Sequence, residues 1–266
     1  MSDTNWVHTE AQGPIAILTL NQPERRNPIS NLGMVEALVS ALEKADRDPA
    51  LRVAILTGAG SAFSAGGDLQ QLTAGHEDSL IGCDPGDTPM NYRQGIQRIP
   101  RCIEALGIPV IAAVNGPAVG AGCDLACACD IRLGSDRAIF SESFVALGLI
   151  PGDGGSWLLP RIVGFSRATQ MALTAERIDA HTALSIGLLS EVTSTERLLP
   201  RALELAQMIA EHPREAVRAT RQLLRRSCQL TLDETLVLAA AEQALAHERE
   251  EHRSALAHWM AKIKPS

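Results

Sequence analysis

The sequence predicts an α/β fold, because short apolar runs of the kind that form buried strands alternate with a segment of helical periodicity. Three such runs, each bounded by Gly, Pro or Asn, occupy residues 15–20, 53–57 and 110–114. Between the first two, apolar residues recur at helical spacing, which predicts a helix near residues 31–46 that covers one face of the strands. The alternation of strand and helix favours the α/β class.

Two further strands are predicted at residues 131–133 and 138–141, followed by a glycine-rich loop at 151–155. Residues 71–98 mix Gly, Pro, Asp and polar residues without a clear period, and we interpret them as a mobile insertion beside a site. Within this stretch Met90, Tyr92 and Ile96 are expected either to line a substrate pocket or to pack the insertion itself.

After about residue 165 the chain is predicted to be almost wholly helical. Thr231 to Glu234 have the form of a capping box, which opens a predicted helix running from residue 232 towards 261. Its first half keeps apolar residues at helical spacing, whereas residues 247–252 are strongly charged. So long a helix is expected to leave the globule and to pack on a subunit partner.

Composition excludes several classes of protein. The 266 residues carry a formal net charge of −7, with 45% hydrophobic and 21% charged residues, as in an ordinary globular protein. No basic run suggests nucleic-acid binding, and neither a long apolar stretch nor a signal-peptide pattern is present. We therefore expect no nucleic-acid partner, no membrane association and a cytoplasmic location. The cysteines are expected to be reduced and mostly buried, and Cys123, Cys127 and Cys129 lack the nearby histidine of a zinc site.

Two glycine-rich segments, residues 63–69 and 115–125, follow apolar runs. Small residues at such turns let a ligand approach the backbone, and the amides of a helix's first turn have no intrahelical acceptor. Both segments could also be no more than tight turns between a strand and a helix. Neither is a P-loop, Gly120-Ala121-Gly122 lacks the third glycine of the dinucleotide fingerprint, and Gly154-Gly155-Ser156 is not a nucleophile elbow. Together, the two turns could hold one oxygen between two amides and stabilise the enolate-like charge of an activated thioester.

Residues 20–30, 53–69, 109–132 and 140–164 resemble the enoyl-CoA hydratase/isomerase, or crotonase, superfamily, and the likeness extends to the C-terminal W-M-A-K-I-K-P. The resemblance implies a crotonase-like spiral of ββα units with a C-terminal helical region. It divides the chain into a spiral core with the acyl-CoA site, residues 1–200, and a helical trimerisation region, residues 201–266. It also implies homotrimers, often paired into hexamers, and an acyl-CoA substrate. No separate cofactor is expected, because coenzyme A is part of the substrate.

By position, the resemblance assigns the two amides that hold the thioester oxygen to Gly67 and Ala121. Main-chain groups of Ala65 and Leu69 would hold the adenine, and Arg25 would lie near the CoA phosphates or the pantetheine arm. Three C-terminal residues match positions that in relatives reach the nucleotide of a neighbouring subunit: Trp259, Lys262 and Lys264. For each basic residue the alternative is a solvated surface charge.

Hydratases of this superfamily use two glutamates, whose positions here hold Asp124 and Phe144. A phenyl ring cannot transfer a proton, so another carboxylate would have to replace the second glutamate. Glu142 lies on the same side as Phe144 if residues 138–144 are extended. Asp153 occupies the loop where some isomerases of the superfamily place an aspartate one position earlier. We expect Asp124 and Asp153 to form the acid/base pair, with pKa values raised by apolar surroundings. Asp124 could instead cap its helix, and Asp153 could be a turn residue.

Three functions remain open. Hydration of a 2-enoyl-CoA is slightly favoured by its abundance in the superfamily, and the aspartates with Phe144 favour double-bond or ring isomerisation of an acyl-CoA by proton relay. The third is acyl-CoA binding without catalysis, because Phe144 removes a reactive group.

Overall fold

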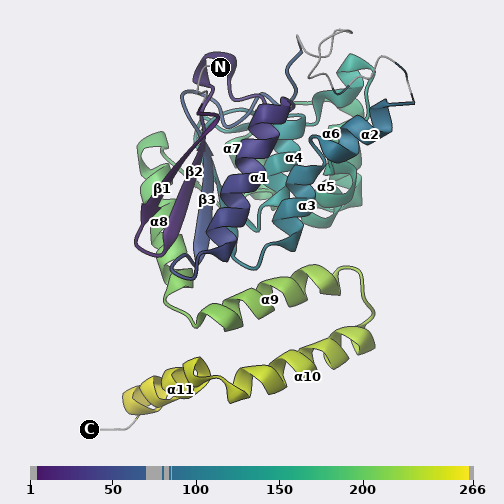
Figure 1. Ribbon diagram of the computed structural model, residues 1–266. Helices are drawn as coiled ribbons and strands as arrows, with labels where there is room; N and C mark the ends of the chain where they lie inside the picture. The colour runs from purple at the N-terminus through teal and green to yellow at the C-terminus, as the bar shows by residue number, and fades with distance from the viewer. Residues whose placement is uncertain (1–4, 70–79, 81–83, 85, 264–266) are drawn as a thin grey trace.

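The computed structural model describes residues 5–69, 80, 84 and 86–263, and a six-stranded sheet forms its centre (Figure 1). The strands follow the order β1-β2-β3-β4-β6-β9, and only the β1–β2 pair is antiparallel. Their bounds are Val7–Gln12, Ile15–Leu20, Val53–Gly58, Val110–Val114, Ile131–Ser135 and Glu191–Thr193. The parallel pairs require long crossover connections, which are helical here. The predicted α/β class is confirmed.

Helices cover both faces of this sheet, which explains why β2, β3 and β4 are almost continuously apolar. Alternate residues of each strand point to opposite sides: Leu18 and Leu56 pack towards α1 (Leu32–Arg47) and α3 (Arg98–Ala105). Ile17 and Ile55 pack on the other side, against α8 (Thr195–Ala210). The predicted strands at 15–20, 53–57 and 110–114 and the helix near 31–46 are confirmed.

A second, three-stranded sheet carries the loops of greatest interest. Its strands are β5 (Ala118–Val119), β7 (Ile139–Ser141) and β8 (Ile178–Asp179), in the order β5-β7-β8. Helix α4 (Ala121–Ala128) follows β5 after a single glycine. The short helices around this sheet are η1 (Pro23–Arg25), η2 (Ser143–Leu147), α5 (Gly155–Val163), α6 (Phe165–Thr174) and α7 (Ala180–Ser185).

The predicted strands at 131–133 and 138–141 are confirmed as β6 and β7. The condition that residues 138–144 are extended is not met: β7 ends at Ser141, because its partners β5 and β8 are each only two residues long, and the chain then turns into η2. The stretch 71–98 is not irregular throughout, since it contains α2 (Thr88–Gln94) and the first residue of α3. Residues 70–79, 81–83 and 85 of the predicted mobile insertion lie outside the described residues.

The C-terminal part forms three helices: α9 (Arg214–Ser227), α10 (Leu232–Glu248) and α11 (Glu250–Ile263). The capping box at Thr231 and Glu234 is confirmed, but the predicted single helix from 232 is wrong. The backbone of Arg249 is extended, and the acidic pair Glu250 and Glu251 then opens α11, where negative charge favours a helix N-terminus.

Helices α10 and α11 lie on the far side of α9 from the sheet (Figure 1), and no residue of either is buried. The predicted boundary at residue 200 falls inside α8, and the division into two regions stays a prediction. Among the helices of the described residues, none combines the length and apolar character needed to cross a membrane.

Candidate active site

The two glycine-rich segments lie side by side, because β3 and β4 are neighbouring parallel strands and both segments leave the same edge of the sheet. Ser64 and Ala118 form an isolated parallel bridge, and the amide of Val119 donates to the carbonyl oxygen of Ser64 at 3.0 Å. The second segment then enters α4 through Gly120. The predicted strand-to-helix turn is therefore confirmed for residues 115–125.

Gly66 brings the segments into close contact. Its φ of +84° lies in the left-handed region, and a Cβ atom there would stand 2.2 Å from the Val119 oxygen and 3.0 Å from the Ala121 nitrogen. Only glycine fits such a position. The next residue, Gly67, is thus placed beside the start of α4.

The amides around this contact divide into used and free donors. Gly66 donates to the Ser64 hydroxyl at 3.1 Å, Asp68 to the Ser30 hydroxyl at 2.9 Å and Gly120 to the Ser141 carbonyl at 2.8 Å. In the part of the chain that the structure describes, the amides of Gly67 and Ala121 donate no hydrogen bond. Ala121 is the first residue of α4, where positive dipole and free amides favour an anionic oxygen.

Asp124 projects from the first turn of α4 into the protein interior. Its side chain is 2% exposed, and neither carboxyl oxygen has a donor among the residues described. It caps no helix, since α4 begins without a side-chain cap. A Cβ atom on Gly155 would stand 2.0 Å from Asp124 Oδ1, so the glycine at the start of α5 makes room for the carboxyl group. Burial, and then the nearby charge of Glu142, raises the pKa of Asp124 well above its ordinary value.

Asp153 reaches the same place from the loop before α5. A small cavity joins it to Asp124 and the start of α4, and the rest of its wall is apolar: Ile29, Ile96, Ile99, Pro100, Ala121, Leu125 and Ala128. Burial, and then the charge of Glu142, raises the pKa of Asp153 to about 7. The structure thus brings Ala121, Asp124 and Asp153 together.

Glu142 is also buried beside Asp124, although the reasoning that suggested it fails. It is the residue after β7 rather than part of a strand that reaches Phe144, and its side chain is 1% exposed. Both its oxygens lack a donor in the described residues, and burial raises its pKa. The ring of Phe144 lies 3.7 Å from where a Cβ atom of Gly120 would stand, so it flanks the entrance to α4.

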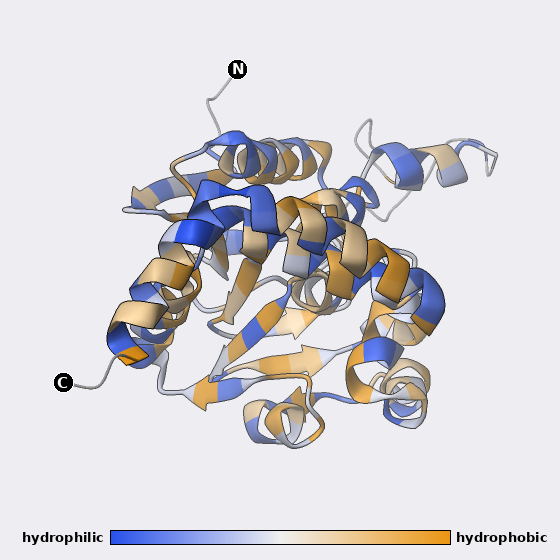
Figure 2. Ribbon diagram, turned by 90° about the horizontal axis from the view of Figure 1, so that it is seen from below, coloured by the Kyte–Doolittle hydropathy of each residue, from blue (hydrophilic) through white to orange (hydrophobic). Residues whose placement is uncertain are grey.

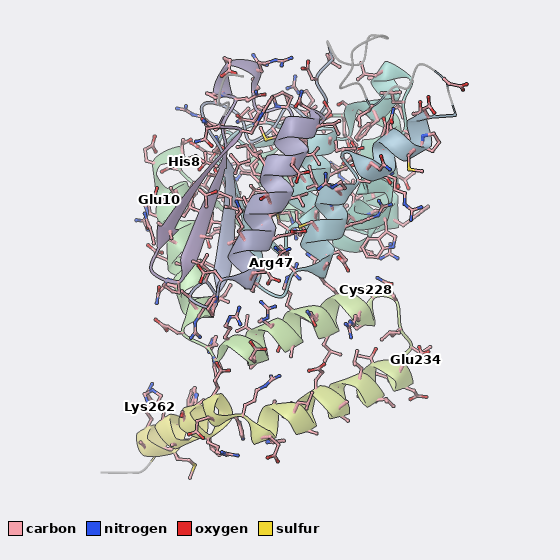
Figure 3. The ribbon with its side chains drawn as sticks, viewed as in Figure 1. His8, Glu10, Arg47, Cys228, Glu234 and Lys262 are labelled. Carbon is pink, nitrogen blue, oxygen red and sulfur yellow. The ribbon has the colours of Figure 1, made fainter. Side chains whose placement is uncertain are left out.

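The residues predicted to bind CoA divide into two groups. Near Gly67, the Arg25 guanidinium forms an ion pair with the Asp68 carboxylate, and the Ala65 amide donates to the Arg26 carbonyl at 2.7 Å. Leu69 is exposed. Trp259 and Lys262 lie together on α11, with the ammonium 5.8 Å from the ring centre. Helix α11, where Figure 3 labels Lys262, lies beyond α9 from the sheet. Lys264 lies outside the described residues.

Sequence reasoning missed part of the cavity wall and the role of Gly155. Of the predicted pocket residues, Ile96 lines the cavity, Tyr92 packs on Gly152 and Met90 is exposed. Ile99 could have been found from the 3.6-residue period that begins at Ile96. Gly155 has no such signal, because the close approach that requires it comes from a different helix.

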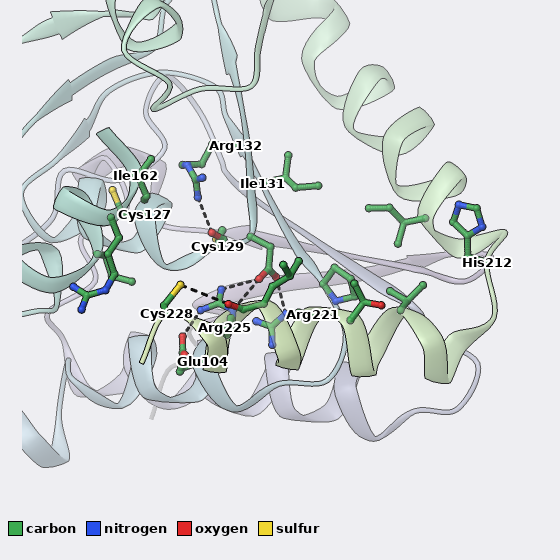
Figure 4. Close-up of a pocket in the computed structure, with 18 of the residues that line it drawn as sticks. Glu104, Cys127, Cys129, Ile131, Arg132, Ile162, His212, Arg221, Arg225 and Cys228 are labelled. Carbon is green, nitrogen blue, oxygen red and sulfur yellow. Dashed lines mark hydrogen bonds and ion pairs between the residues drawn. The ribbon is translucent and has the colours of Figure 1, made fainter. Parts of the chain in front are cut away.

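A larger cavity of about 780 Å³ lies between α9 and the body (Figure 4). Several of its charged groups pair with one another: Asp130 accepts from Arg221 and Arg225, and Arg225 also pairs with Glu104. None of the predicted site residues lines it. In the described part of the chain no three His, Cys, Asp or Glu side chains are grouped as metal ligands.

Comparison with known proteins gives consistent results across the chain. The family model "Enoyl-CoA hydratase/isomerase" matches residues 10–266. The short-chain-enoyl-CoA hydratase of Clostridium acetobutylicum is 32% identical over 98% of this chain and 97% of its own length. The 1,2-epoxyphenylacetyl-CoA isomerase of Escherichia coli is 36% identical over 98% and 97%. A crystal structure of an enoyl-CoA hydratase/isomerase from Cupriavidus metallidurans superposes with a TM-score of 0.90 at 30% identity, covering 100% of this chain and 97% of that one.

Proposed function

The chain belongs to the enoyl-CoA hydratase/isomerase, or crotonase, family, and we propose that it isomerises an acyl-CoA by moving a proton between carbon atoms of the acyl group. One observation carries this proposal. Asp124 and Asp153 line the same small cavity beside the Ala121 amide, and its remaining walls are apolar. Such a cavity lets carboxyl groups exchange protons with carbon while water is kept away.

In this proposal the thioester carbonyl oxygen lies between the amides of Gly67 and Ala121. Both amides are free to donate in the described structure, and Gly66 holds the two segments in contact. When a proton leaves the carbon next to the carbonyl, the electron pair moves onto this oxygen as an enolate. Each preorganised donor stabilises that charge by about 3 to 4 kcal/mol.

Asp124 and Asp153 then exchange the proton. One carboxylate accepts a proton from carbon, and the C–H electron pair becomes part of the enolate. The other, as a carboxylic acid, donates a proton to a second carbon, and the double bond moves with no net change in atoms. A pKa of about 7 for Asp153 suits this role, because both protonation states are populated near neutral pH. Ring or epoxide rearrangement would use the same two groups.

Hydration of a 2-enoyl-CoA is the second candidate, favoured by one specific observation. Two carboxyl groups face a single cavity, as required to hold a water molecule and to manage its protons, although Phe144 stands at the position of the second family glutamate. The relatives include proteins named as hydratases and one named as an isomerase. Of the two reactions, isomerisation is favoured by the apolar walls of the cavity.

CoA binding is proposed to use residues from two chains. Two of these residues, Ala65 and Leu69, are each two positions from Gly67 in the sequence. The ion pair with Asp68 holds Arg25 near them. These three residues therefore fit the substrate of their own subunit. Trp259 and Lys262 lie at the far end of the same chain, so they would serve the site of a neighbouring subunit in a homotrimer or a hexamer.

A direct assay tests the reaction. The protein is incubated with crotonyl-CoA and, separately, with a 3-enoyl-CoA, and the products are followed by absorbance of the conjugated thioester and by mass spectrometry. Isomerisation gives conjugated product from the 3-enoyl ester without a mass change, whereas hydration adds the mass of one water to crotonyl-CoA. Binding without turnover of a wide panel of CoA thioesters would contradict both candidates.

The Asp124→Asn variant tests the residue assignment. It is expected to lose turnover by about 100-fold or more while CoA affinity stays within twofold, because the amide cannot take a proton from carbon. Asp136→Asn is the matched control, since the Asp136 carboxylate is exposed and bonds only to Thr195 among its described side-chain partners. Full turnover by Asp124→Asn would refute the mechanism.

A further inference from the structure

Glu142 is a buried carboxyl group that the proposed mechanism does not use. Pairing of β5 with β7 sets Val119 opposite Ser141, and the Gly120 amide donates to the Ser141 carbonyl at 2.8 Å. The residue after Ser141 is therefore fixed at the entrance to α4. From there the Glu142 side chain enters the interior next to Asp124, and it is 1% exposed.

The contact between these two groups is an acid-to-acid contact. All four carboxyl oxygens of Asp124 and Glu142 lack an N–H or O–H donor in the described part of the chain. After burial, the charge of Glu142 is the main cause that raises the pKa of Asp124, and a hydrogen bond between two carboxyl groups forms only when one of them carries a proton. Two neighbouring buried carboxylates without N–H or O–H donors are not both ionised, and a shared proton satisfies both.

We propose that Glu142 is a positioning residue that holds Asp124 through a shared proton, so that the two carboxyl groups act as one acid–base unit. The inference rests on the proposed function, because it gives Asp124 the proton transfer. Glu142 does not line the cavity that contains Asp124 and Asp153, so it acts through Asp124 and not on the substrate. It fixes the orientation of the Asp124 carboxyl and keeps one proton available to it.

The groups that shift the pKa values of the pair are acids and thiols. Besides each other, these are Cys123 and Cys127 on α4 and Asp153 on the loop before α5. A positive neighbour would let both carboxylates ionise, whereas this environment retains the shared proton.

The test compares Glu142→Gln with the native protein in the isomerisation or hydration assay over a range of pH. The amide fills the same space and still donates to Asp124, but it can neither carry a negative charge nor supply an acidic proton. We expect kcat to fall about 10- to 100-fold with KM within twofold, because Asp124 becomes a weaker base. The acid limb of kcat/KM is expected to move to lower pH, since removal of a neighbouring negative charge lets Asp124 ionise more readily. Glu142→Asp should restore part of both changes.

The controls separate this inference from the proposed function. Glu191→Gln removes a carboxylate that pairs with Arg201 at the edge of the main sheet, and it should leave the pH profile unchanged. If Asp124→Asn abolishes turnover but Glu142→Gln keeps kcat and the pH profile, the inference fails and the proposed function stands. If Asp124→Asn retains turnover, the proposed function itself fails.

A measurement on the native protein covers the case in which Glu142→Gln does not fold. With ¹³C in the side-chain carboxyl carbons of Asp and Glu, NMR at pH 7 should show one proton held between Asp124 and Glu142 and two coupled titrations. Two fully ionised carboxylates at pH 7, or two independent titrations, would overturn the inference.

Discussion

The pKa of Asp153 predicts how stability depends on pH. The pKa rises from the ordinary 3.8 to about 7 in the folded protein, mainly through burial. Between these values folding takes up a proton, so native stability falls as pH rises, by about 1.4 kcal/mol per pH unit. Asp153→Asn cannot titrate and escapes this loss. The free energy of unfolding of Asp153→Asn minus that of the unsubstituted protein should therefore increase by about 2 to 3 kcal/mol from pH 5 to pH 8.

Urea unfolding at the two pH values measures this difference, with Asp136→Asn as the exposed control. The same variant should lose activity, because the amide cannot donate or accept the transferred proton. A stability difference that stays constant between pH 5 and pH 8 would show that Asp153 is ionised in the folded state.

Gly155 predicts an activity loss from one added methyl group. It is the first residue of α5, and a Cβ atom at this position would stand 2.0 Å from Asp124 Oδ1. Gly155→Ala should displace the carboxyl group and lower kcat by about 100-fold, as misplacement of a catalytic group by about 1 Å does. Steady-state kinetics and thermal unfolding are to be measured on the same preparation.

Gly13→Ala is the matched control. Gly13 has a φ of +56° in the β1–β2 hairpin and nothing within 4 Å of a Cβ atom. The variant should lose about 1 kcal/mol of stability and keep its activity. Native kcat in Gly155→Ala would mean that the Asp124 carboxyl moves without consequence for the reaction.

For single residues, the family resemblance pointed to Asp124 and Asp153, and their catalytic roles stay a prediction. The structure buries both side chains and raises both pKa values, as expected for an acid/base pair in apolar surroundings. The surroundings of Glu142 and Gly155 could not be predicted in the same way. Each depends on contacts between β7, α4 and α5, and a single sequence gives no distance between such segments.

At the level of helices, the ion pairs of α9 predict that loss of the Asp130 carboxylate lowers the free energy of unfolding strongly. Asp130 accepts from Arg221 Nε at 2.8 Å, from Arg225 Nε at 2.9 Å and from the Val110 amide at 2.8 Å. The Arg221 side chain is only 4% exposed. Asp130→Ala leaves two guanidinium groups without this counterion, so it should cost about 3 to 5 kcal/mol of unfolding free energy.

Glu43→Ala is the control for this substitution. Glu43 pairs with Arg47 one turn away on α1, where both side chains are exposed. Its loss should cost less than about 0.5 kcal/mol, because exposed ion pairs contribute little. If Asp130→Ala unfolds in urea as the native protein does, α9 is held to the body by apolar contacts and not by this network.

The predicted strands and helices succeeded where burial leaves a clear pattern in the sequence. Strands β2, β3 and β4 are buried on both faces, and their short apolar runs bounded by Gly, Pro or Asn identify them. The end of β7 and the break between α10 and α11 carry no such signal. The first is set by how long its partner strands are, and the second lies in a charged stretch where no face is buried.

The exposed apolar side chains of α10 and α11 indicate that the chain associates with other copies of itself. Figure 2, viewed from this side, shows hydrophobic residues along these helices, and eight large apolar side chains on them are exposed: Leu232, Leu236, Val237, Leu245, Leu256, Trp259, Met260 and Ile263. Many exposed large apolar side chains on neighbouring helices are typical of a protein interface. Because α11, which carries Trp259 and Lys262, lies beyond α9 from the body, subunit association would also complete the proposed CoA site.

We therefore predict that Leu236→Glu combined with Val237→Glu dissociates the assembly and weakens CoA binding, whereas Gln243→Glu on the same helix does neither. Sedimentation should give the native protein three or six times the 28.4 kDa of one chain, and the double variant that of one chain. Burying two glutamates without partners against an apolar surface costs several kcal/mol. CoA affinity, measured by calorimetry, should fall together with the mass, because each site would lose Trp259 and Lys262 of its neighbour. A monomeric variant that binds CoA as tightly as the native protein would place the whole CoA site within one chain.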